Sequence, residues 1–146
     1  MTSPDPSQAR VAVIADGMSA EVAARFSYSY GVRWGSLMWI SGQVALRDGE
    51  VVGVGDIELQ TRTVFENLSR ILAAAGGGLD DLVSTTTYMT DRSYSAAINA
   101  VRAEFLTGAV KPTSTLLVVS GLARPEFLVE ISAVAALGSG LPGAAA

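Results

Sequence analysis

Two segments near the C-terminus, residues 113–120 and 127–136, constrain the fold most because they are apolar on both faces of a predicted strand. In the first segment, Leu117 and Val119 share one parity, while Leu116 and Val118 share the other. Side chains alternate between the two faces of a sheet, so both faces of this strand need apolar partners. A chain of 146 residues with two predicted helices can cover only one face. A homo-oligomer that closes sheet against sheet is the simplest way to cover the other.

The remaining hydrophobic pattern predicts three strands, a helix, a strand, a helix and the two strands above. The first three strands are expected at residues 28–34, at residues 37–41 and near Val51 and Val52, the last after a turn at Asp48 and Gly49. Asp56 can cap a helix that runs to about Ala75. Residues 82–90 are rich in β-branched side chains, so we expect them to form the fourth strand. The second helix is expected to begin at Asp91 or Ser93, and its inward-facing residues are Ile98, Val101 and Phe105.

The pattern divides the chain into three parts. Residues 1–26 form an N-terminal extension that we expect to be partly flexible, residues 27–137 the main domain, and residues 138–146 a disordered tail rich in Gly, Ala and Pro. Within the extension, residues 11–14 can form a short strand and residues 19–25 a helical turn or two. The hydrophobic pattern of these two segments does not decide between a strand, a helix and a loop.

The chain contains no histidine and no cysteine, which limits the chemistry open to it. A Ser-His-Asp or Cys-His nucleophile, a zinc site of His and Cys ligands and a disulfide framework are all excluded. We therefore expect no metal and no cofactor, and any catalysis must use carboxylates, hydroxyls, amides, arginines or a water that they position.

Charge and hydrophobicity restrict the partners. The net charge is −4 and Lys111 is the one lysine, so the clustered excess of basic residues that nucleic acid binding draws on is missing. No apolar stretch approaches the ~20 residues of a membrane-spanning helix, and residues 11–15 lack the basic flank and the length of a signal peptide. We expect a cytoplasmic protein that binds neither nucleic acid nor membrane.

Glu130 is the first candidate for catalysis because it lies in an apolar run, residues 127–134. A carboxylate leaves water at a cost, so this one must be paired, protonated or face a wet cleft. A strand-edge glutamate in a salt bridge is the alternative. Tyr28 could instead be a residue of the hydrophobic core, and Asn99 could be an exposed surface amide. The stretch from Lys111 to Thr115 offers hydroxyls and backbone N–H groups that could bind an anion.

Taken in order, these residues resemble the RidA/YjgF family. The motifs are Tyr28-Ser29, Ser41-Gly42-Gln43, Asn67-Leu68, Asn99, Pro112-Thr113-Ser114-Thr115 and Val129-Glu130-Ile131, and they span roughly residues 28–136. The resemblance implies an α+β, chorismate-mutase-like fold with a six-stranded mixed sheet and two helices on one face. It also implies a homotrimer with small-molecule clefts between its subunits.

The resemblance further implies hydrolysis of a 2-imino or enamine acid to a 2-oxo acid and ammonia. In that chemistry Glu130 would hold the attacking water, and Tyr28 and Asn99 would help to frame the substrate. Ser114 and Thr115 would also lie in the substrate site. The family places a carboxylate-clamping arginine two residues after the proline, where this chain has Ser114. A serine hydroxyl cannot replace a planar bidentate guanidinium.

Two functions stay open on this basis. The first is a deaminase, a hydrolase of an enamine or imine other than the usual 2-imino acids. Either its substrate lacks that carboxylate, or another cation, Arg33 or Arg124, replaces the missing clamp. The second is a non-catalytic trimer that binds a small molecule or a protein. Some relatives are described as ribonucleases, but an acidic chain without histidine is poorly suited to that activity.

Overall fold

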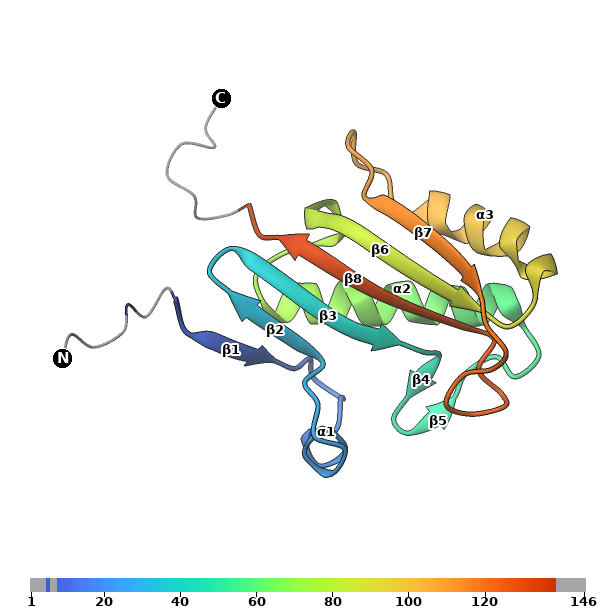
Figure 1. Ribbon diagram of the computed structural model, residues 1–146, viewed down its shortest axis with the longest axis horizontal. Coiled ribbons are helices and arrows are strands. Elements are labelled where there is room, and N and C mark those ends of the chain that lie inside the picture. Colours follow the sequence, from blue (N-terminus) through green and yellow to red (C-terminus); the bar gives the residue numbers. More distant parts are fainter. Residues whose placement is uncertain (1–4, 6–7, 139–146) are drawn as a thin grey trace.

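The protein folds around one six-stranded sheet with the strand order β1-β2-β3-β8-β6-β7 (Figure 1). This computed structural model describes residue 5 and residues 8–138. All neighbouring strands of the sheet are antiparallel except β6 and β7, which are parallel. The strands are β1 Arg10–Val13, β2 Gly31–Trp34, β3 Leu37–Gln43, β6 Leu82–Met89, β7 Thr113–Val118 and β8 Val129–Ala136, and the helices are α1 Ala20–Arg25, α2 Ile57–Ala74 and α3 Ser95–Phe105. The predicted α+β fold with a mixed six-stranded sheet is confirmed.

The sixth strand of the sheet is not the one that the pattern predicts. The strand expected near Val51 and Val52 is β5 (Glu50–Val51), which pairs only with β4 (Leu46–Arg47) in a separate two-stranded ladder. Asp48 and Gly49 between them have φ of 51° and 81°, the left-handed values of a tight hairpin turn, so the ladder closes on itself. The place in the main sheet belongs to β1, the short strand in the N-terminal extension, which pairs with β2.

Two element starts differ from the prediction. The strand expected from Tyr28 begins at Gly31, because Ser27, with a φ of 56°, turns the chain sharply between α1 and β2. The second helix begins at Ser95, after a 3-10 turn at Arg92–Tyr94. Asp91 caps that turn and not the α-helix, since its carboxylate accepts a hydrogen bond of 2.8 Å from the Ser93 N–H.

Helix α2 carries much of the core. Asp56 caps it as predicted, accepting from the Leu59 N–H at 3.0 Å. The helix packs against β3, β8 and α3, and its fully buried apolar side chains are Val64, Phe65, Leu68, Ile71 and Leu72. Gln60 is also fully buried. It donates to the carbonyls of Gly53 and Glu126 and accepts from the Leu128 N–H, which ties the segment before β8 to the helix.

The side of the sheet away from α2 is open in the single chain. Along β8 the buried residues alternate with half-buried ones that point the other way, among them Glu130 and Val134. The strand register places Trp39 opposite Val134 on this open face, and Tyr88 opposite Glu130 with Leu117 beside it. Trp39 is 44% exposed and Leu117 43%, and all six residues of β7 are exposed. In the part of the chain that the structure describes, no helix is long and apolar enough to cross a membrane.

Candidate functional site

Glu130 is a half-buried carboxylate without a partner in the part of the chain that the structure describes. It is the second residue of β8, not the middle of the strand as the sequence suggests, and its neighbours Val129 and Ile131 are fully buried on the helix side. Among the described residues no hydrogen bond or ion pair engages its carboxylate. Burial raises its pKa above the ordinary glutamate value, because a charge loses solvation when water is removed from it.

The backbone of β3 is shaped to receive this carboxylate. The pairing of β3 with β8 shifts register between Ile40 and Gln43, which marks a bulge beside Glu130. A side chain at Gly42 would overlap the Glu130 carboxylate. Glycine at this position therefore leaves the space in which the carboxylate lies, and it also lines the pocket described next.

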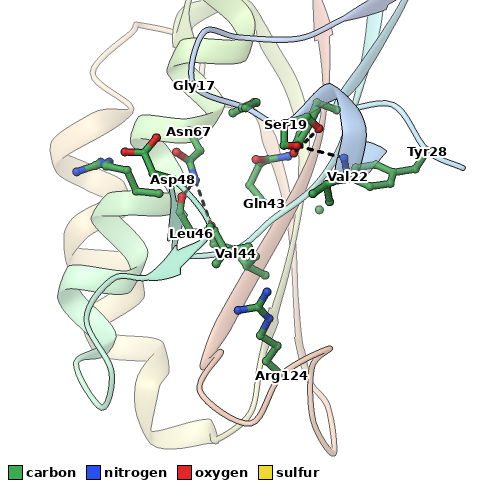
Figure 2. Close-up of a pocket in the computed structure, with 15 residues that line it drawn as sticks. Gly17, Ser19, Val22, Tyr28, Gln43, Val44, Leu46, Asp48, Asn67 and Arg124 are labelled. Carbon is green, nitrogen blue, oxygen red and sulfur yellow. Dashed lines mark hydrogen bonds between the residues drawn. The ribbon is translucent and has the colours of Figure 1, made fainter. Parts of the chain in front are cut away.

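A pocket of about 580 Å³ lies beside this bulge. Its wall comes from the turn before α1, from residues 42–44 and 46–49, from Asn67 of α2 and from Arg124 of the loop between β7 and β8 (Figure 2). The apolar part of the wall includes Met18, Val22, Val44 and Leu46. A pocket of this volume, with an apolar wall and a few polar groups, is typical of a small-molecule site.

Tyr28 enters this pocket as a neutral hydroxyl. It stacks edge-on against Tyr30 with ring centroids 5.3 Å apart, and burial, together with the hydrogen bond to the Tyr30 hydroxyl, raises the pKa of Tyr28 to about 12. The Ser41 hydroxyl donates to the Ser29 carbonyl at 2.6 Å, which fixes the Tyr28 segment beside β3. A tyrosine with this pKa keeps its proton at neutral pH, so it can donate a hydrogen bond and cannot serve as a base.

Asn67 adds a buried polar group to the pocket. Its Nδ2 donates to the carbonyls of Val44 and Leu46, each at 3.1 Å, and so holds the start of the β4–β5 ladder. Its Oδ1 is buried without a partner among the described residues. An unpaired buried acceptor can take a hydrogen bond from a water or a ligand.

The other predicted site residues lie elsewhere in the chain. Asn99 is exposed on α3, and Ser114 and Thr115 are exposed on β7 at the edge of the sheet. The strand order puts β7 at the opposite end of the sheet from β2, which Tyr28 precedes. A single chain thus separates Tyr28 from Ser114 and Thr115, and Glu130 lies between them on β8, two strands from β2 and two from β7.

The cations proposed from the sequence take different positions. Arg124 lines the pocket, and Figure 2 shows its side chain reaching from the loop toward the part of the wall that Val44 forms. Arg33 instead bonds to the Gly35 carbonyl at the β2–β3 turn and does not line this pocket. Lys111 donates to the carbonyls of Leu106 and Gly108, so its ammonium group is engaged after α3.

The sequence pattern did not single out Arg102 as a site residue. The residue is half-buried on α3, and its Nη1 donates to the Thr85 hydroxyl at 2.9 Å. Its position three residues after Asn99, on the same helix surface, was the available signal. Among the described residues no group of three or more acidic side chains is placed to hold a metal ion.

Comparison with known proteins agrees with this architecture. Residues 18–137 match the family model described as Endoribonuclease L-PSP. The RutC family protein PH0854 of Pyrococcus horikoshii is 40% identical over 110 residues, which cover 74% of this chain and 85% of that protein. The chain belongs to the endoribonuclease L-PSP family, in which the RidA proteins are placed.

Solved structures support the same family. YyfA of Yersinia pestis, described as a Rid family protein of unknown function, superposes with a TM-score of 0.79 at 28% identity, over 88% of this chain and all of that one. RidA from an Antarctic Psychrobacter species gives a TM-score of 0.77 at 29% identity, over 87% and 99% of the two chains.

Proposed function

We propose that this protein hydrolyses an enamine or imine to a carbonyl compound and ammonia, with Glu130 as the residue that positions and deprotonates the attacking water. The observation that carries the proposal is the half-buried Glu130 carboxylate, which has no partner among the described residues and lies against Gly42 of the pocket wall. A structural glutamate in the same place would be expected to have an arginine or lysine partner. A raised pKa brings a carboxylate closer to the pH at which a general base works best.

The reaction requires one water and returns every proton. The water oxygen forms a bond to the carbon of the protonated imine as Glu130 takes a proton from the water, which gives a neutral carbinolamine. Glu130 then gives this proton to the amino nitrogen. As the carbon–nitrogen bond breaks, Glu130 takes the hydroxyl proton, so the carbonyl forms and ammonia leaves. Ammonia then takes that proton from Glu130, which restores the carboxylate and gives ammonium. Tyr28, protonated at neutral pH, donates a hydrogen bond to the polar atoms of the intermediate.

The active site is completed by a second subunit in a homotrimer. The open sheet face and the exposed apolar residues of β7 support this proposal, because both need apolar cover. In the trimer, Asn99, Ser114 and Thr115 of one subunit would line a cleft with Glu130 and Tyr28 of its neighbour. The expected cytoplasmic location stays a prediction.

The substrate differs from the simple 2-imino acids of the arginine-bearing relatives, because Ser114 stands where those proteins carry the clamp. We expect slow hydrolysis of 2-iminopropionate and faster hydrolysis of a larger imine, since the pocket of about 580 Å³ exceeds the needs of a three-carbon acid.

The test uses imines generated in situ by an amino-acid oxidase and trapped with semicarbazide. The wild-type protein should compete with the trap for at least one imine, and Glu130→Gln should not. Glu50→Gln, at an exposed position of β5, is the matched control and should behave as wild type. If no imine from a broad panel is hydrolysed, or if Glu130→Gln retains the rate, the chain is better described as a binding trimer.

A further inference from the structure

Arg102 is a half-buried cation with no acidic partner among the described residues. Helix α3 carries it on the turn after Asn99, and the one hydrogen bond of its guanidinium in the described structure goes to the Thr85 hydroxyl at 2.9 Å. The nearby Glu104 does not neutralise it, because its two oxygens bind Arg62. Burial lowers the pKa of Arg102, yet an arginine stays charged in a protein. Its remaining N–H donors are therefore available to an anion.

The strand register brings Ser114 to the same place. Thr85 of β6 lies directly beside Ser114 of β7 in the parallel pairing, on the sheet face that α3 approaches through Arg102. Thr85 itself donates to the Thr113 carbonyl at 3.1 Å, so its hydroxyl links Arg102 to the start of β7. The small side chain of Ser114 leaves the guanidinium room at the exposed edge of the sheet.

We propose that Arg102, with Asn99 and Ser114 beside it, forms the binding site for the carboxylate of the substrate. The proposal rests on the function proposed above and names its substrate class, an imine that carries a carboxylate. The guanidinium comes from α3 and not from β7, so the carboxylate is held against the helix.

Binding measurements test the site without turnover. The probes are 2-oxobutanoate and its uncharged methyl ester, titrated into wild-type protein and followed by calorimetry or by NMR shifts. Wild type should bind the acid at least about 10-fold more tightly than the ester, since a charge-assisted bidentate pair is lost in the ester. Arg102→Met should bind the two probes equally.

Two further variants separate recognition from packing. Arg102→Lys keeps the stem and the charge but not the planar fork, so it should fold normally and discriminate less than wild type. In an Arg102→Met background, Ser114→Arg returns a guanidinium to the same edge and should restore the preference for the acid. Arg92→Met removes an exposed arginine just before α3 and is the matched control.

The rival cation is Arg124 of the pocket. If Arg124→Met abolishes the preference for the acid while Arg102→Met preserves it, the proposal is wrong, and it is equally wrong if wild type does not discriminate between the probes. A protein that discriminates through Arg102 but hydrolyses no imine would refute the hydrolase and keep the site. If the protein hydrolyses an imine and Arg102→Met does not change that activity, the hydrolase is retained and the Arg102 site is refuted.

Discussion

At the scale of single residues, Glu130 is held where burial opposes its charge. Its pKa is raised in the folded protein, so the folded state binds the proton more tightly than the unfolded state does. The free energy of unfolding must then decrease as the pH rises through the interval between the unfolded and folded pKa values, and the penalty persists above it. Such a cost at one residue is typical of a site kept for function.

Glu130→Gln removes this titration. We expect its melting temperature at neutral pH to equal or slightly exceed that of wild type, and the two curves to converge when both proteins are measured below the ordinary glutamate pKa. Thermal melts from pH 4 to pH 8 provide the measurement. A buried ion pair broken by the same change would instead cost about 3–5 kcal/mol, so a large fall in melting temperature would contradict the interpretation.

Gly42 offers an independent test of the same carboxylate. Gly42→Ala places a Cβ where the Glu130 carboxylate lies, so it should displace that group and reduce imine hydrolysis at least about 10-fold, by the weight usually carried by a general base. Gly121→Ala is the matched control, because a Cβ there meets nothing within 4 Å. If Gly42→Ala and Gly121→Ala hydrolyse the imine at equal rates, the position of the Glu130 carboxylate does not affect the reaction.

At the scale of elements, local signals and tertiary pairing contribute differently. Helix α2 starts where its cap predicts, at Asp56, and its apolar stripe is the buried stripe. The short strands β1 and β5 have little pattern of their own. Pairing decides their roles, so β1 joins the main sheet and β5 joins β4.

The contribution of the Asp56 cap to the free energy of unfolding can be measured separately. Asp56→Ala removes the acceptor for the Leu59 N–H and should lower the free energy of unfolding by about 1 kcal/mol. Asp56→Asn keeps an acceptor and should recover most of that loss. Urea unfolding of the three proteins gives the comparison, and a cap variant as stable as wild type would contradict the local origin of this helix start.

At the scale of the whole molecule, the open sheet face favours assembly. We expect a homotrimer at micromolar concentration in sedimentation or light scattering. Leu117→Glu places a charge on that face and should produce smaller species. Val110→Glu is the control, since Val110 is 85% exposed in the loop before β7, outside the sheet. A wild-type chain that sediments as a stable monomer would refute the assembly and the shared cleft together.

The sequence alone determined the elements with strong local signals. Periodicity and capping located α2, the strand at residues 82–90 and the two apolar strands near the C-terminus, because local geometry fixes which side chains share a face. The family resemblance likewise followed from residues in order. An acidic residue among apolar ones was enough to single out Glu130, whose side chain proves to be unpaired and half-buried.

The tertiary structure decided which of these residues meet. Gly42 faces Glu130 at a register shift between β3 and β8, and Arg102 of α3 bonds to Thr85, which the parallel pairing of β6 and β7 places beside Ser114. Neither contact follows from spacing along the chain, since each joins residues brought together only by strand pairing and helix packing. The sequence therefore determines the chemical groups that are available, and long-range pairing determines the sites that they form.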